Sequence, residues 1–428
     1  MNNSSTLLSF KEKIASANTE AVEKMMNSDP LLVGVDLAYT SIPNFQSKMI
    51  LHAGPPIEWH NMCGALKGAI IGAIIYEKRS DDIILAEKLA SSGEIVFDTC
   101  HDHSTVGPMA GVISPNMPVF VIKDRISNTS AYSNFNEGLG KALRFGAYDE
   151  DVISKLDWMR KELFESLKTA LRTLIARNGG GISLKAIISQ ALQMGDECHN
   201  RNQAGTSLFL RELTPALIES LDKRDAIAAY NFINSNNHFF LNIVLAASKC
   251  MADMSHNIKY STLVSAISRN GTEVGIRVSG LGNDWFTHTA PVPAGLYFAG
   301  YSTSDANPDI GDSTITETVG LGAAAMAASP SIVKFVGGNI EDALEMTERF
   351  KRITIAEHKY FTIPYANFEG TPTGIDIRKV LRSGIAPRAN TGIAHKNPGI
   401  GQIGAGIVTL PLAPFKKALL AFVKKYGV

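Results

Sequence analysis

The segment from residue 295 to residue 318 contains the densest group of side chains that could do chemistry. Its acidic residues are interleaved with asparagine, glycine, serine and threonine, and they are Asp305, Asp309, Asp312 and Glu317. Apolar residues are too few for a core helix and do not alternate as in a half-buried strand. We therefore predict a turn-rich loop in which Asn307, Asp309 and Asp312 contact a substrate. A network of turns and helix caps that satisfies its own polar groups is the structural alternative.

A second polar cluster lies near the middle of the chain, between residues 194 and 204. If the helix that begins at Leu184 continues, Asp196 and His199 lie three residues apart on one face. Such a carboxylate can fix the tautomer of the histidine, so we predict that Asp196 orients His199 as a general base. Arg201, balanced by Glu197, is predicted to hold a carboxylate or phosphate of the substrate. A solvated helix end with ordinary ion pairs is the alternative.

Two histidines separated by one residue follow a predicted strand at 94–97. Imidazole and carboxylate suit zinc or iron, so His101 and His103 could join Asp98 around a metal ion. The spacing fixes no third ligand, however, and no metal site is predicted. His103 is instead predicted to be a second candidate for the catalytic base, with a structural role as the alternative.

Two further motifs supply groups that could bind anions. Arg277 lies within a predicted strand of apolar residues, where a guanidinium faces either water or an anionic ligand. Near the C-terminus, Thr391, His395 and Lys396 lie among glycines that allow the backbone to approach a ligand. We predict that all four bind substrate. The glycines there lack the preceding strand and the acidic residue of a dinucleotide-binding fold, so no cofactor is predicted.

These motifs are predicted to converge on one cleft between domains, where polar substrates are commonly bound. His103, His199, Asp309 and His395 should then lie within a substrate-sized distance, on the order of 15 Å, of a common point. Several polar clusters in one chain indicate an enzyme that acts on a small polar substrate.

Composition limits the class of protein. The 428 residues are 45% hydrophobic and 19% charged, which indicates large buried cores and two or three domains. The 41 basic and 41 acidic residues cancel, which argues against binding to nucleic acid or to an anionic membrane. The N-terminal residues lack the pattern of a signal peptide, and four widely spaced cysteines fit a reducing compartment. We therefore expect a cytoplasmic protein.

Three regions differ in their patterns. We predict a multidomain α+β and α/β protein with an N-terminal α/β domain at 1–148, a helical domain at 149–258 and a glycine-rich α+β domain at 259–428. The glycines at 179–181 should end a helix over 152–177, and Ser183 should cap the next helix. Small residues at the start of a predicted helix over 59–76 allow either ligand binding or close packing. Strands are predicted over 31–36, 118–123 and 275–279, and further helices over 208–222, 224–257, 315–328, 340–359 and 414–425.

Four motifs carry a resemblance to a known family. They are MGDECHNRNQAGTSLF, RNGTEVGIRVSGLG, GYSTSDANPDIGDSTITET and NTGIAHKNPGIGQIGAG. Together they resemble the YlbE/YahG-like family, and the resemblance extends from about residue 30 to the C-terminus. It implies a subunit of an oxamate carbamoyltransferase in anaerobic allantoin breakdown. The implied reaction is that of oxalurate with phosphate to give oxamate and carbamoyl phosphate.

The same resemblance implies protein partners. These are an FdrA-type protein similar to acyl-CoA synthetases and a small third subunit, and a homo-oligomer is also expected. Two alternatives remain open. One is a metal-dependent hydrolase or lyase built on His101, His103 and the loop from Asp305 to Asp312. The other is a non-catalytic subunit that completes the site of a partner.

Overall fold

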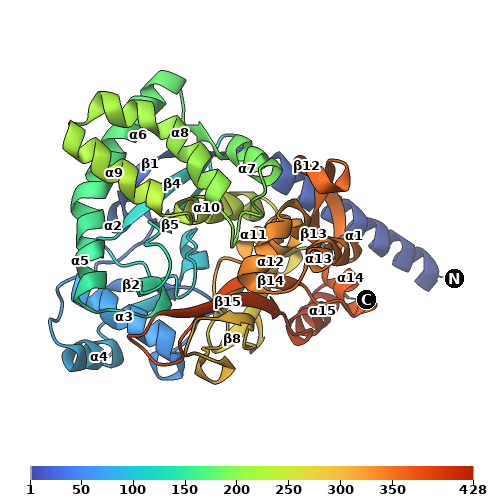
Figure 1. The fold of residues 1–428 in the computed structure, drawn as a ribbon. Coiled ribbons are helices and arrows are strands. Elements are labelled where there is room, and N and C mark those ends of the chain that lie inside the picture. The colour runs from blue at the N-terminus through green and yellow to red at the C-terminus, as the bar shows by residue number, and fades with distance from the viewer. Residues whose placement is uncertain (1, 428) are drawn as a thin grey trace.

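The computed structural model describes residues 2–427 of the chain. Its secondary structure mixes helices with several small sheets, which confirms the predicted α+β class (Figure 1). No helix within these residues is long and apolar enough to cross a membrane.

An antiparallel sheet organises the first part of the chain. Its strand order is β5-β4-β1-β6. The strands are β1 (Pro30–Leu37), β4 (Pro118–Asp124), β5 (Ser130–Asn134) and β6 (Ile182–Ser183), which confirms the strands predicted over 31–36 and 118–123. Helices α6 (Phe164–Asn178) and α10 (Phe239–Asp253) contact this sheet.

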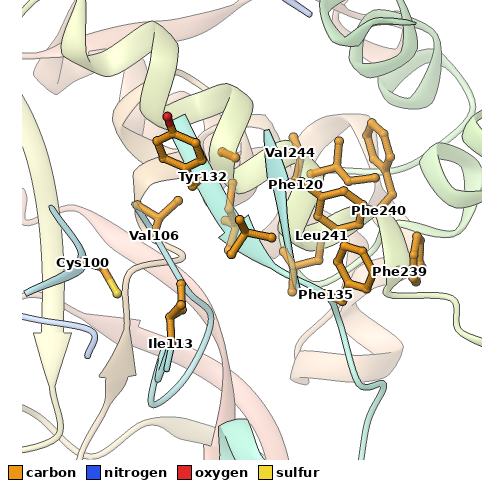
Figure 2. Packing of buried hydrophobic residues seen from close by; sticks show 14 of the residues in the cluster. Cys100, Val106, Ile113, Phe120, Tyr132, Phe135, Phe239, Phe240, Leu241 and Val244 are labelled. Atoms are coloured by element: carbon orange, nitrogen blue, oxygen red, sulfur yellow. The ribbon is translucent and has the colours of Figure 1, made fainter. Parts of the chain in front are cut away.

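Helix α10 is buried along almost its whole length, because it is apolar on nearly every side. Figure 2 shows its first turn against the sheet, where the ring of Phe239 meets the ring of Phe120 edge-on with centroids 5.7 Å apart. Phe120 in turn packs against Phe135 with centroids 4.6 Å apart. Burial of each such ring stabilises the folded state by roughly 1.5–3 kcal/mol. The same core includes residues on both sides of position 148, so the division of the chain into three domains stays a prediction.

A parallel strand pair and two helices lie beside this sheet. The elements are β2 (Met49–His52), β3 (Val96–Thr99), α3 (Gly64–Tyr76) and α4 (Ile83–Ser91). The small residues of α3 serve close packing, which decides between the two interpretations of the sequence. A side chain at Gly64 would overlap the carbonyl of Lys396, and one at Gly68 would overlap the carbonyl of Gly146.

The helices between residues 150 and 253 follow the predicted periodicity with one difference. They are α5 (Glu150–Trp158), a π-helical turn (Met159–Leu163), α6, α7 (Leu184–Gln193), α8 (Gln203–Ser220), α9 (Lys223–Ser235) and α10. Gly179 ends α6 at a positive φ, and the Ser183 side chain caps α7, as predicted. The single helix predicted over 224–257 is wrong, because the side chain of Asn236 accepts the backbone N–H of His238 and breaks the helix there.

Three antiparallel sheets form most of the last third of the chain, with orders β11-β7-β8-β9, β10-β15-β14 and β12-β13. The strands are β7 (Val264–Asn270), β8 (Glu273–Val278), β9 (Phe286–Thr289), β10 (Ala294–Tyr297), β11 (Ile310–Gly311), β12 (Thr354–Ile363), β13 (Glu369–Ile375), β14 (Arg388–Ala394) and β15 (Gln402–Thr409). The helices are α11 (Ile315–Thr318), α12 (Val333–Val336), α13 (Ile340–Ile353), α14 (Ile377–Ser383) and α15 (Ala413–Tyr426). The predicted helix over 315–328 is broken at Gly320, which has a φ of +88°. The helix predicted over 340–359 ends at Ile353 and continues as β12.

The first helix, α1 (Asn2–Asn27), contacts α10, β12 and β13. It extends to one side of the molecule, near the last helix of the chain (Figure 1). The sequence patterns did not predict this helix.

Candidate functional site

The polar cluster at 194–202 is a loop between α7 and α8. Helix α7 ends at Gln193, and Gly195 and Cys198 have φ angles of +95° and +63°. These left-handed positions turn the chain sharply, so the assumption of a continuing helix is wrong. Asp196 and His199 therefore do not share a helical face.

The acidic partner of His199 is Glu317 from α11. Nδ1 of His199 lies 2.8 Å from Oε1 of Glu317, and only 2% and 0% of the two side chains are exposed. The predicted partner, Asp196, instead accepts the backbone N–H of Gly205 in the first turn of α8 at 2.9 Å. Burial raises the pKa of Asp196 to about 6. The prediction that Asp196 orients His199 is thus corrected.

The surroundings of Glu317 favour one tautomer of the His199 ring. Oε1 of Glu317 also accepts the backbone N–H of Ala323 at 2.9 Å, and Oε2 accepts the hydroxyl of Thr316 at 2.9 Å. A carboxylate so surrounded by donors favours the proton on Nδ1 of His199. Nε2 is then the basic nitrogen, and it has no hydrogen-bond partner among residues 2–427. His199 can therefore exchange a proton with a ligand through Nε2.

His199 lines a small inner pocket with a volume of about 20 Å³, which has room for little more than one water-sized group. Arg144 and His238 line it too, and Nδ1 of His238 is buried without a partner in the described chain. Burial, reinforced by the charge of Arg144, lowers the pKa of His238 to about 3, so this imidazole is neutral. The buried Nδ1 of His238 is thus free to bond to a ligand.

An outer pocket of about 190 Å³ adjoins the inner one and contains Arg201. The two pockets share Leu139, Asn200, His238 and Phe335 as lining residues. Nε of Arg201 donates to the carbonyl of Gly195 at 3.0 Å, and the side chain is 37% exposed. The predicted pair of Arg201 with Glu197 is wrong, because Asp196 is the carboxylate near this guanidinium, at 3.5 Å. His199 and Arg201 therefore line two adjoining pockets, which together form the His199 cavity, and their predicted roles stay predictions.

Glu197 is a buried acceptor behind this loop. Its Oε1 accepts the backbone N–H groups of His199 at 3.1 Å and Arg201 at 2.6 Å. Its Oε2 is 3.1 Å from Nδ2 of Asn390, whose Oδ1 has no partner within residues 2–427. If that amide were flipped, Oδ1 of Asn390 would accept a hydrogen bond from the protonated carboxyl of Glu197. Burial raises the pKa of Glu197 to about 7.

This raised pKa gives stability a dependence on pH with a defined sign. Folded Glu197 keeps its proton up to about pH 7, whereas the unfolded chain releases it near its ordinary value of 4.5. The free energy of unfolding should therefore fall as pH rises between these values, by on the order of 3 kcal/mol for this group. In Glu197→Gln, thermal unfolding midpoints from pH 5 to pH 8 should fall less steeply than in the wild type. Equal slopes would show that Glu197 ionises normally in the folded protein.

The acidic loop is predominantly structural. Asp309 forms a buried ion pair with Arg269, with Nε 2.6 Å from Oδ2, and also accepts the hydroxyl of Thr391 at 2.8 Å. Asp312 accepts the backbone N–H groups of Gly54 at 3.0 Å and Gly107 at 3.1 Å. Asp309, Asp312 and Thr391 line neither pocket at His199. The prediction that these three bind substrate is therefore not supported by their contacts, and the structural alternative describes them.

Asn307, His395 and Lys396 lie together in another part of the C-terminal region. Nδ2 of Asn307 contacts Sγ of Cys63 at 3.3 Å and the carbonyl of Pro308 at 2.6 Å. Nδ1 of His395 accepts the backbone N–H of Asn397 at 2.9 Å, and Nζ of Lys396 donates to the carbonyl of Ser304 at 2.7 Å. These bonds brace the loop, and none of the three residues lines a pocket at His199.

His103 and Arg277 belong to a further region. Both ring nitrogens of His103 are engaged, Nε2 by Asp98 at 2.9 Å and Nδ1 by the carbonyl of Pro43 at 3.3 Å. Arg277 pairs with Asp102 at 2.6 Å. Neither residue lines the cavity at His199, so the structure does not bring the predicted motifs into a single cleft. Within residues 2–427, no three His, Cys, Asp or Glu side chains gather as metal ligands.

Sequence patterns missed the residues that complete the cavity. Glu317 stands among the acidic residues of the loop, but its position on α11 gave no sign of a histidine partner. Arg144 and His238 lie outside the polar clusters, and nothing in their neighbours indicated a pocket. The sequence could have indicated that Arg269 has a structural role, because this charged residue lies in a strand between Ser268 and Asn270.

Comparisons with known proteins place the chain in one family. Residues 95–313 match the family model described as oxamate carbamoyltransferase subunit AllG. The chain is 46% identical to the uncharacterized protein YahG of Escherichia coli K12, over 97% of this chain and 88% of that protein. It is 42% identical to the oxamate carbamoyltransferase subunit AllG of the same organism, over 97% of this chain and 99% of that protein.

A solved structure has the same fold. The crystal structure of a conserved protein of unknown function from Enterococcus faecalis V583 superposes with a TM-score of 0.94 at 46% identity. The match covers 97% of this chain and 99% of that one.

Proposed function

Since the chain belongs to the family of the oxamate carbamoyltransferase subunit AllG, we propose that it is a catalytic subunit that transfers a carbamoyl group between oxalurate and phosphate. The observation that carries this proposal is the buried His199–Glu317 pair at the inner end of a cavity that also contains Arg144 and Arg201. A carbamoyl transferase needs a proton-transfer group next to cations that hold anionic substrates.

In this proposal His199 acts as an acid in the phosphorolysis of oxalurate and as a base in the reverse reaction. In phosphorolysis, a phosphate oxygen attacks the carbamoyl carbon of oxalurate, and the bond from that carbon to the amide nitrogen breaks. The imidazolium of His199 gives its Nε2 proton to the leaving nitrogen, which yields oxamate and carbamoyl phosphate. In the reverse direction, neutral His199 takes the amide proton of oxamate as that nitrogen attacks carbamoyl phosphate. Glu317 is a positioning residue that stabilises the charged ring in both directions.

Two arginines supply positive charge for the anionic groups. Arg144 uses Nε and Nη2 to donate to the carbonyl of Gly138, at 3.1 and 2.6 Å. Burial lowers its pKa to about 10, so the guanidinium is charged at neutral pH. Within residues 2–427, the side chain of Arg201 makes its one hydrogen bond through Nε, so the Nη atoms are available to a ligand in the outer pocket that Arg201 lines. We assign the carboxylate of oxamate or oxalurate, or the phosphate, to Arg201 in the outer pocket, and Arg144 adds positive charge at the inner pocket.

Arg201→Lys tests the assignment to the outer pocket. An ammonium cannot reproduce two parallel hydrogen bonds to an oxyanion, so KM for oxalurate or phosphate should rise about tenfold while kcat changes less. Steady-state kinetics of the assembled enzyme give both constants. Arg352→Lys, at an exposed position, is the matched control and should leave both unchanged. An unchanged KM for both substrates in Arg201→Lys would remove Arg201 from the substrate site.

The proposed enzyme acts in a complex, with an FdrA-type protein and a small third subunit as proposed partners. The test is oxalurate phosphorolysis, followed as carbamoyl phosphate formation, by this chain alone, by the partners alone and by the reconstituted complex. We expect activity only when this chain is present. Full activity of the partners without it would show that the chain is a scaffold, and the proposal would fail.

A further inference from the structure

A second polar pocket lies away from the cavity at His199. It has a volume of about 230 Å³ and is enclosed by α10, by the β7–β8 hairpin and by the 3₁₀ turn Cys100–His103. None of its lining residues lines the inner or the outer pocket at His199. Its interior is therefore a separate site on the molecule.

Two cations lie deep in this pocket, and their carboxylate partners lie closer to the solvent. Nζ of Lys249 is 2.6 Å from Oδ1 of Asp253, and Nη2 of Arg277 is 2.6 Å from Oδ1 of Asp102. The lysine and arginine side chains are 5% and 6% exposed, whereas the aspartates are 29% and 33% exposed. In each of these two ion pairs, the cation is thus the more buried partner.

Several polar atoms in the residues that line this pocket have no hydrogen-bond partner in the described chain. Both ring nitrogens of His101 and Nε of Arg277 are buried and have no hydrogen-bond partner within residues 2–427. Oδ1 of Asp312 lies 3.5 Å from Nε2 of His101. A buried polar atom without a partner destabilises the folded chain, so the arrangement is unfavourable unless another group completes these bonds.

The aromatic ring of Trp285 holds two of these groups in place. The guanidinium of Arg277 lies over the ring, 4.4 Å from its centroid, and His101 meets the ring edge-on with centroids 5.5 Å apart. The N–H groups of a guanidinium lie in its own plane, so contact of its face with an aromatic ring leaves them free for hydrogen bonds. Packing against Trp285 thus fixes the guanidinium of Arg277 in the wall of the pocket.

The chemistry of the open groups identifies the class of ligand. Ammonium and guanidinium groups can only donate hydrogen bonds, and a neutral imidazole donates through one nitrogen. The ligand must therefore accept several bonds, as an oxyanion does. Asp102 and Asp253 at the rim repel large polyanions, so the ligand must be compact. We propose that this pocket binds a small oxyanion, of the phosphate or carboxylate type, between Lys249, Arg277 and His101. The inference is independent of the function proposed for the His199 cavity.

Calorimetric titration with inorganic phosphate and, separately, with oxamate tests the proposal. The chain should carry Arg201→Gln, so that binding in the His199 cavity is weakened and the second pocket is measured. At least one anion should bind, and the stronger ligand identifies the type. Absence of binding by both anions would overturn the proposal.

Substitutions in the pocket then test whether the anion binds there. Arg277→Met and Lys249→Met, each in the Arg201→Gln background, should weaken binding by about tenfold or more, because each removes a charged donor. Arg352→Met is the control for loss of one exposed positive charge and should bind as the background does. Thermal unfolding of each variant checks the fold, and Lys249→Met keeps the test valid if Arg277→Met is unstable. Unchanged affinity in a folded Arg277→Met or Lys249→Met chain would exclude this pocket.

Discussion

Replacement of His199 by alanine should reduce kcat for oxalurate phosphorolysis by about 10²–10⁴ in the assembled enzyme, the usual cost of losing a positioned acid or base. The variant should fold normally, so the lower kcat should reflect the missing imidazole. The backbone N–H of residue 199 still donates to Glu197, and its carbonyl still accepts from Asn202. Glu317 also keeps the donors of Ala323 and Thr316.

The control for this variant is His288→Ala, which removes an exposed histidine on β9. It should turn over at the wild-type rate. Thermal unfolding of both variants should match that of the wild type within a few degrees. If His199→Ala is native in stability and near normal in kcat, His199 is a structural residue. The His103 segment then does not become an obvious substitute, because both nitrogens of that ring are already bonded.

Arg269→Met should lower the free energy of unfolding by about 3–5 kcal/mol, because it leaves the carboxylate of Asp309 buried without its ion pair. The guanidinium reaches Asp309 through Nε and Nη2, and through Nη1 it donates to the carbonyl of Gly311 and to the hydroxyl of Thr314. It therefore ties β7 to the loop that leads into α11. Loss of this anchor should also disturb Glu317 on α11 and so lower turnover.

Chemical denaturation measures the effect, and two further variants interpret it. Arg382→Met, at an exposed position, should unfold like the wild type. Arg269→Met combined with Asp309→Asn should recover part of the lost stability, because no uncompensated charge then remains buried. A loss below about 1 kcal/mol in Arg269→Met would mean that Asp309 finds water or another partner, and the loop would not depend on this pair.

The fold class and most helices could be predicted because they depend on local patterns. Glycines at 179–181 end a helix, and Ser183 caps the next one, through contacts with residues near in the sequence. The break between α9 and α10 was missed, since it depends on one asparagine side chain in an otherwise helical pattern. Helix α1 was missed as well.

The site was predictable only in part, because its decisive contacts are distant in the sequence. His199 was identified from its polar neighbours, but its partner Glu317 is 118 residues away. Helical spacing favoured Asp196, and two left-handed positions in the loop make that spacing irrelevant. Asp309 looked like a ligand-binding residue because the sequence does not reveal that Arg269, 40 residues earlier, neutralises it. A dense polar cluster therefore does not by itself separate residues that line a pocket from residues that only hold a loop.

The central claim is that His199 and Glu317 act as one proton-transfer unit, and a double-variant comparison tests it most directly. Glu317→Gln keeps an oxygen for the donors of His199 and Ala323, and its amide can donate to Thr316, so the local structure should persist. The measurement is kcat for oxalurate phosphorolysis by complexes that contain His199→Ala, Glu317→Gln or both changes. Residues that act as a unit lose their effect together, so the double variant should be no slower than His199→Ala alone. Losses that multiply in the double variant would show that the two side chains act independently and would contradict the claim.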